Sequence, residues 1–139
     1  MSTTTSNARP TSGSTTSAGP LLLALKVFAA LAVVAVLWQF VTAGQLLPRG
    51  SEGAETGHAA GAIVLHVVSG LAAIAAVVLW RQRVVSLALA ALAVVVFAFG
   101  FLQAALGGYS SLYVHIPGAM LLTAGVVWLL VAAVRSRRA

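Results

Sequence analysis

The chain has no cysteine and no aspartate, and its only acidic residues are Glu52 and Glu55. Without cysteine it has no disulfide framework, no thiolate-bound zinc or iron–sulfur cluster, and no thiol nucleophile. Three histidines without a catalytic carboxylate or the His-Glu-x-x-His spacing do not make a zinc hydrolase. These absences leave a small catalytic repertoire, and the sequence does not decide whether the chain is an enzyme.

Charge is scarce as well. Only 7% of the residues are charged, whereas 60% are hydrophobic, and the mean hydropathy is +1.04. A soluble domain has about a quarter charged residues, so this chain has too few to cover a surface that faces water. The 139 residues therefore predict a single domain, embedded in the lipid bilayer as an integral membrane protein.

Four apolar runs divide the chain. Residues 1–20 are rich in Ser, Thr, Gly and Pro, which predicts a disordered tail. The remainder, 21–139, forms a membrane domain whose runs are each long enough to cross a bilayer core of about 30 Å. Short connections favour an all-α, antiparallel four-helix up-down bundle, with a polar loop expected over 44–57. The predicted spans are about 21–43, 59–80, 84–106 and 112–134.

Basic residues are distributed unevenly between the two sides of this layout. Four spans place both termini and the connection at Arg81 and Arg83 on one side, which holds seven of the eight Lys and Arg residues. Arg49 lies on the other side with both glutamates. Because cytoplasmic segments are enriched in Lys and Arg, we expect a multi-pass protein of the cell inner (plasma) membrane with both termini in the cytoplasm. The charges flank the spans and form no patch with aromatics, which disfavours a nucleic-acid partner.

Two histidines lie inside the predicted spans. His66 is well inside the second span, and His115 is near the start of the fourth, while His58 is expected at the mouth of the second helix. Ionisable side chains in a bilayer are costly and often functional. A structural role is the alternative, in which His66 bonds to Ser69 or to a backbone carbonyl and His115 is an ordinary interfacial residue.

Small side chains share the helix faces of these histidines, such as Ala62 near His66 and Gly118 near His115. Such residues allow close helix packing, but they also allow a slot for a flat macrocycle between imidazoles. Neutral imidazole is a standard axial ligand of haem iron. We therefore predict His66 and His115 as metal ligands of a haem b between the second and fourth spans. The sequence does not decide whether His58 takes the place of His66.

Polar residues at the same end offer partners for the propionates of a haem. Arg49 and Tyr109 are placed to donate charge-assisted hydrogen bonds to carboxylates, although a tyrosine there also fits an interfacial aromatic belt. Gln103 ends the third span beside them. The predicted cofactor-binding residues are His66, His115, Arg49, Tyr109 and Gln103.

The stretch 102–122, LQAALGGYSSLYVHIPGAMLL, resembles a segment of haem A synthases. In that segment a helix ends in a Gln-x-x-x-Gly-type motif, matched here by Gln103 and Gly107, and a loop leads to a histidine that opens the next helix. The helix with His66 is similar to the preceding histidine-bearing helix of that family. The chain also resembles small four-helix bacterial membrane proteins.

This resemblance implies that residues 21–134 correspond to one of the two four-helix halves of a haem A synthase. It implies haem binding by His66 and His115. It does not imply oxidation of a haem methyl group, because the second half and the intramembrane glutamate of that family are missing and the loop before His115 is shorter.

Three functions are compatible with the sequence. The first is a bacterial haem-binding membrane protein that serves electron transfer or haem handling. The second is a non-enzymatic accessory or structural subunit, with other membrane subunits or further copies of the chain as partners. The third is a small transporter, which is least favoured because four-helix exporters need a membrane-embedded carboxylate and both glutamates lie in the outer loop.

Overall fold

The computed structural model describes residues 18–46 and 52–136, so Arg49 and residues 1–17 lie outside the described part. Within that part the chain is all-helical, which confirms the predicted all-α class. Four α-helices and one short 3-10 helix follow one another along the described residues. They are α1 (Ala18–Gln45), α2 (Glu52–Arg81), α3 (Leu87–Ala105), η1 (Tyr109–Ser111) and α4 (Leu112–Arg135).

All four α-helices have the length and apolar composition needed to cross a membrane. They contain 28, 30, 19 and 24 residues in chain order. At 1.5 Å per residue even α3 is about 29 Å long, close to the hydrocarbon core of about 30 Å. These are the dimensions of a multi-pass membrane protein, as the composition predicts.

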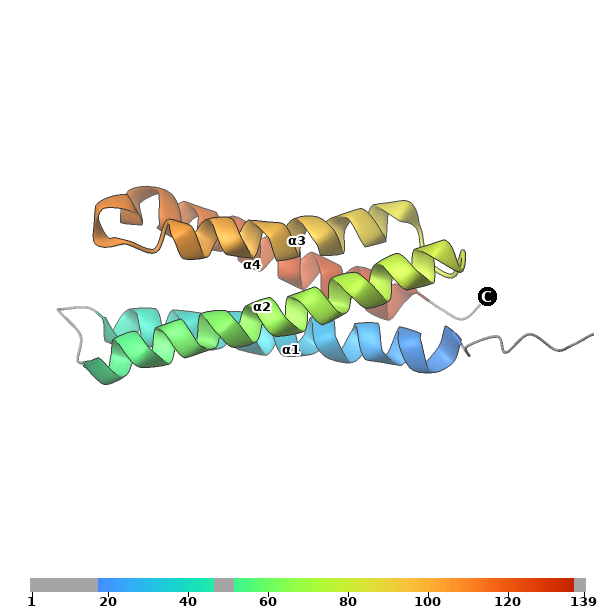
Figure 1. Ribbon diagram of the computed structural model, residues 1–139, viewed down its shortest axis with the longest axis horizontal. Helices are drawn as coiled ribbons and strands as arrows, with labels where there is room; N and C mark the ends of the chain where they lie inside the picture. Colours follow the sequence, from blue (N-terminus) through green and yellow to red (C-terminus); the bar gives the residue numbers. More distant parts are fainter. Residues whose placement is uncertain (1–17, 47–51, 137–139) are drawn as a thin grey trace, which may run out of the picture.

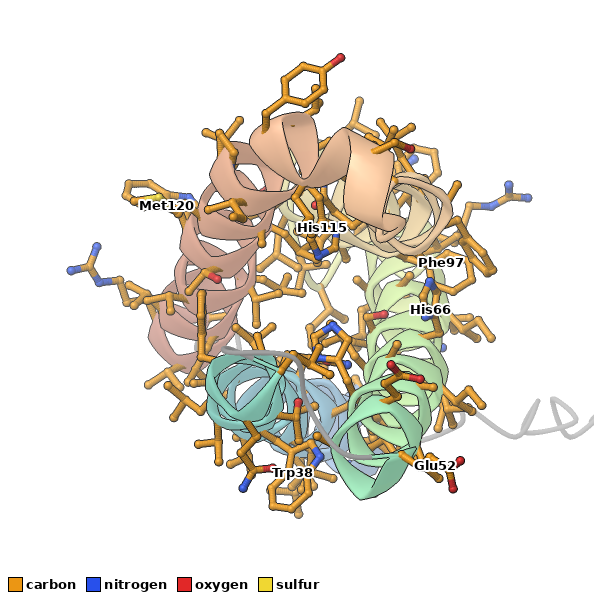
Figure 2. All side chains as sticks on the ribbon, turned by 90° about the vertical axis from the view of Figure 1, so that its left-hand side faces the viewer. Trp38, Glu52, His66, Phe97, His115 and Met120 are labelled. Atoms are coloured by element: carbon orange, nitrogen blue, oxygen red, sulfur yellow. The ribbon has the colours of Figure 1, made fainter. Side chains whose placement is uncertain are left out.

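The four α-helices lie side by side along the long axis of the molecule (Figure 1). α1 and α3 each pack against both α2 and α4. Between α1 and α3, and between α2 and α4, no two Cα atoms of the described residues come within 8 Å. Seen along the axis, the helices occupy four corners around a shared interior (Figure 2). The histidine-bearing helices α2 and α4 are therefore diagonal neighbours.

The two ends of the bundle differ in the segments they carry (Figure 1). One end holds η1, the last turn of α1 and the first turn of α2, and we call it the η1 end. The opposite end holds the start of α1, the end of α4 and the connection at Arg81 and Arg83, and we call it the Arg81 end.

The interior is apolar from the Arg81 end to the middle of the bundle. Near the Arg81 end, Leu25, Leu79 and Leu129 are fully buried among alanines from all four helices. In the middle, Val36 and Val126 belong to a second apolar cluster. Small residues in these clusters let the helices approach closely. Beyond the second cluster, toward the η1 end, the interior becomes polar.

A polar loop was expected over 44–57, before the second span. Part of this segment is helical instead, because α2 already begins at Glu52. Glu52 and Glu55 lie in its first turn, where negative charge stabilises the positive end of the helix dipole. The hydroxyl of Thr56 donates to the carbonyl of Glu52 at 2.9 Å. His58 therefore lies inside α2 and not at its mouth.

A tight motif ends α2 at the Arg81 end. Arg83 has a φ of 61°, in the left-handed region that few residues other than glycine adopt. Its N–H donates to the carbonyl of Trp80 at 2.8 Å, and the N–H of Val84 donates to the carbonyl of Leu79 at 2.9 Å. This pair of bonds is a Schellman motif. Ser86 then caps α3 by accepting a first-turn N–H at 3.2 Å.

Candidate functional site

Each of the four α-helices contributes a polar side chain to the interior at the η1 end. Thr42 of α1 and Gln103 of α3 are almost completely buried, with 1% and 5% of their surface exposed. His58 of α2 and His115 of α4 are half-buried. We call Thr42, His58, Gln103 and His115 the polar cluster; hydrogen bonds join them in two pairs, Thr42 with His58 and Gln103 with His115.

The imidazole of His58 is held by the hydroxyl of Thr42. The oxygen of that hydroxyl lies 3.0 Å from the carbonyl oxygen of Trp38 and 3.1 Å from that of Gln39. Both carbonyls only accept, so the single hydroxyl proton goes to the backbone of α1. The same oxygen therefore accepts from Nδ1 of His58 at 3.0 Å. This assigns the Nδ1–H tautomer to neutral His58 and leaves the lone pair on Nε2.

The imidazole of His115 is held in a similar way. Its Nδ1 lies 2.9 Å from the backbone carbonyl oxygen of Gln103. A carbonyl only accepts, so Nδ1 carries the proton and Nε2 carries the lone pair. The ring projects from α4 into the interior of the bundle (Figure 2). Because His115 is in the first turn of α4, this bond also ties the start of α4 to the end of α3.

His58 and His115 come from the diagonally placed helices α2 and α4, and both lie at the η1 end of the bundle. Each ring uses Nδ1 on its own side of the interior, one on Thr42 and the other on Gln103. The Nε2 atoms are therefore the remaining donor atoms of the pair. Of the two pairings that the sequence leaves open, this geometry favours His58 with His115.

His66 lies elsewhere, between α2 and α3 (Figure 2). Its Nδ1 donates to the carbonyl of Ala62 at 2.7 Å, one of the structural bonds expected from the sequence, while Ser69 bonds to the carbonyl of Leu65 instead. Its ring lies 4.3 Å from that of Phe101, between centroids. Nε2 is buried without a hydrogen-bond partner among the described residues. His66 therefore faces α3.

Close approach of α3 explains this orientation. A Cβ added to Gly100 would lie 3.3 Å from Nε2 of His66, which is tighter than ordinary contact. Glycine at this position thus makes room for the imidazole between the two helices. Nε2 of His66 faces the backbone at Gly100 and the ring of Phe101. Within the described residues, no second metal ligand lies opposite this nitrogen.

Two buried amide oxygens lie close to the polar cluster. Oε1 of Gln103 and Oε1 of Gln39 are buried without a hydrogen-bond partner among the described residues. Leaving such a group unpaired costs about 1–3 kcal/mol. The amide nitrogen of Gln39 is used, since it donates to the carbonyl of His58 at 3.1 Å. The η1 end of the interior therefore offers acceptors and imidazole lone pairs, and no charged side chain takes part in these contacts.

Gly118 shapes the wall of this site. A Cβ there would overlap the side-chain amide of Gln103, so α3 and α4 approach this closely because residue 118 lacks a side chain. Gly118 was predicted only as a small neighbour of His115. Its contact with Gln103 gives that residue a specific packing role at the site.

The remaining predicted site residues are not placed by the structure. Arg49 lies outside the described residues, and Tyr109 forms η1 although its side chain is not described. Their predicted contact with haem propionates therefore stays a prediction. Tyr113, the other tyrosine at this end, is 79% exposed, as expected for an interfacial aromatic residue.

Thr42 and Gln39 are the site residues that the sequence analysis misses. They stand three residues apart on α1 and so share one face of the helix. The signal that could have found them is their polarity, since both interrupt the apolar end of the first span on the same side. Helix α1 therefore contributes to the site, although none of the residues predicted for the site lies in the first span.

The described residues contain no group of three or more His, Cys, Asp or Glu side chains arranged to hold a metal ion. A closed site made of protein ligands alone is thus not formed in this part of the chain. Two imidazoles provide axial ligation only, which suits a metal whose other positions are filled by a macrocycle.

Comparison of the chain with protein-family models, curated proteins and solved structures finds no match.

Proposed function

We propose that the chain is an inner-membrane protein that binds haem b at the η1 end of its bundle, with Nε2 of His58 and Nε2 of His115 as the axial ligands. The observation that carries this proposal is the contact of each ring's Nδ1 with a fixed oxygen, from which the tautomer is assigned. Both have Nδ1 bonded to a fixed oxygen and the lone pair on Nε2. This is the arrangement in which histidines bind metals, with the outer hydrogen bond setting ring orientation.

The diagonal placement of the two histidines also supports the proposal. A macrocycle between two imidazoles needs ligand helices that do not touch, and α2 and α4 meet this condition. His66 is also on α2, but its ring is turned away from α4 and lies against Gly100 and Phe101 of α3. We therefore propose His58 as the partner of His115 and a structural role for His66.

When bound, the haem supplies one-electron chemistry, for electron transfer or for haem handling near the membrane surface. The chain's own residues orient and insulate it. Thr42 and the carbonyl of Gln103 fix the two rings, and burial at this end lowers the local dielectric. The unpaired Oε1 atoms of Gln39 and Gln103 remain as acceptors for donors of the bound group or for water.

The orientation in the membrane is part of the same proposal. The described arginines Arg81, Arg83 and Arg135 lie at the Arg81 end, while both glutamates lie in the first turn of α2 at the η1 end. The positive-inside rule then places the Arg81 end and both termini in the cytoplasm. The polar cluster consequently opens toward the outer surface.

The absorption spectrum of the purified full-length protein tests the proposed function. We expect a Soret band from low-spin haem b in the wild-type protein. His58→Ala and His115→Ala each remove the band or convert it to a five-coordinate spectrum, because each removes one axial ligand. His66→Ala is the matched control and keeps the band, with circular dichroism showing that all variants are folded.

Two results would contradict this assignment. A wild-type protein that is colourless and takes up no haem on reconstitution removes the haem function and favours an accessory subunit. A band that is lost in His66→Ala but kept in His58→Ala restores the pair of His66 with His115.

A further inference from the structure

A groove runs along the outside of the bundle between α3 and α4, remote from the histidines. At the Arg81 end its lining residues include Arg135, Ser86, Ser136 and Trp128. Leu92 forms the inner limit of this part. The groove therefore begins with polar and cationic groups at one end of the membrane span.

The groove continues toward the middle of the bundle with a different character. Leu92 also lines a second hollow, whose walls include Phe99 and Leu121 and which has no polar side chain. Gly125 lies in this second part, where an added Cβ would come within 3.0 Å of Val96. Because residue 125 has no side chain, α3 and α4 can lie close together here without filling the groove between them.

The dimensions of the groove suit one chain of a lipid. From Ser86 to Phe99 it follows α3 for about 20 Å, at 1.5 Å per residue, which is more than one leaflet of a hydrocarbon core of about 30 Å. Trp128 is 65% exposed beside its polar end, where indole rings commonly sit at the headgroup level. The groove therefore has a polar mouth at interface depth and an apolar extension toward the midplane.

Charge determines which headgroup fits. The chain's only acidic side chains, Glu52 and Glu55, lie in the first turn of α2 at the η1 end, so neither can neutralise Arg135. The N-terminus of α3, which begins at Leu87, adds the positive end of a helix dipole to the same mouth. A phosphodiester with a net negative charge complements these groups, whereas a zwitterionic headgroup does so less well.

We propose that the α3–α4 groove binds an anionic phospholipid of the surrounding leaflet. The phosphate contacts Arg135 and accepts from the hydroxyl of Ser86, whose oxygen accepts from the N–H of Leu89 and whose proton is left to donate, and one acyl chain follows Leu92 toward Phe99. This site depends on insertion in a membrane but not on haem, so it stands or falls separately from the polar cluster.

Native mass spectrometry of the full-length protein in detergent tests this site, with dioleoyl phosphatidylglycerol and dioleoyl phosphatidylcholine as the probes. We expect the wild type to retain phosphatidylglycerol preferentially. Arg135→Gln reduces that retention about fivefold, the effect of one basic residue next to an anionic lipid. Arg81→Gln removes the same charge from the same end but outside the groove, so it is the matched control and keeps the preference.

A second variant tests the groove without altering charge. Ala88 lines the polar part and is exposed, so Ala88→Phe fills the groove without disturbing the core and lowers phosphatidylglycerol retention. Equal retention of both lipids by the wild type, or equal losses in Arg135→Gln and Arg81→Gln, would overturn the proposal. Dimers that form without lipid and are lost in Ala88→Phe would also overturn it, because they would identify a second copy as the occupant.

Discussion

At the scale of the single residue, the hydroxyl of Thr42 links the backbone of α1 to the imidazole of His58. This hydroxyl donates its one proton to a carbonyl of α1, and one of its two lone pairs accepts from Nδ1 of His58. Methyl in place of hydroxyl would preserve the volume of the residue but remove both bonds. The orientation of His58 thus depends on a residue of a neighbouring helix.

Thr42→Val tests this dependence. We expect the Nδ1–H of His58 to lose its acceptor, at a cost of about 1–3 kcal/mol for a buried unpaired group, and the ring to lose its single tautomer. Nitrogen-15 NMR of histidine-labelled protein in detergent measures the tautomer directly, and thermal unfolding measures the cost.

Thr123→Val is the control for that variant. Thr123 makes the same kind of bond to its own helix, at 2.7 Å from the carbonyl of Ala119, but no bond between its hydroxyl and a histidine is found among the described residues. Unchanged His58 signals in Thr42→Val would contradict the assigned role of the hydroxyl.

The helix that the ring of His66 faces is the part of the site that could not be predicted from the sequence. In a membrane the outward faces of a helix are as apolar as its inward faces, so hydrophobic periodicity does not report which side meets the interior. Ile63 and Val67 flank His66 and are exposed, while Leu65 is buried with the same apolar character. The pairing of His66 with His115 was predicted from the small residues that share its helix face, whereas depth favoured His58, and only packing against Gly100 reveals the helix that His66 faces.

At the scale of the element, the end of α2 depends on a residue in an unfavourable conformation. A left-handed conformation costs a residue with a Cβ about 1–2 kcal/mol, and Arg83 adopts it to close the Schellman motif. Glycine is the residue most often found at this position of the motif. The motif is nevertheless formed, with Leu79 buried beneath it.

Arg83→Gly is expected to raise the stability of the protein by about 1 kcal/mol, because glycine adopts φ near +60° without steric cost. Arg83→Ala removes the same charge but keeps the Cβ, so it is the matched comparison. Thermal unfolding in detergent should rank Gly above Ala. A protein with Ala at least as stable as that with Gly would show that the conformation of residue 83 stores no strain.

The elements were predictable from the sequence to different degrees. Four apolar runs of membrane length predict four helices, because a bilayer leaves the backbone few other ways to bond. The start of α2 was missed because the polar composition of 52–57 resembles a loop. Two glutamates in its first turn supply the stabilisation that continues the helix into this segment.

At the scale of the whole molecule, the absence of cysteine makes the orientation in the membrane directly measurable. Single cysteines at Gly108 and Gln82 lie at the η1 end and the Arg81 end, respectively, and both positions are exposed. A membrane-impermeant maleimide added to intact cells should label Gly108→Cys. It should label Gln82→Cys only after the membrane is permeabilised, because the Arg81 end is proposed to be cytoplasmic.

The reverse labelling pattern would invert the proposed orientation and move the polar cluster to the cytoplasmic surface. Labelling of both positions in intact cells would contradict a single orientation. The unsubstituted chain, which has no thiol, provides the background in each case.

The change from an apolar to a polar interior along the bundle gives the molecule two unequal halves. In the half near Arg81, leucines and alanines with 0% of their surface exposed fill the centre. This apolar packing excludes water and protons, because it offers them no polar group to bond to. We therefore expect any proton that reaches the imidazoles of the other half to enter and leave at the η1 end, because the half near Arg81 offers it no path.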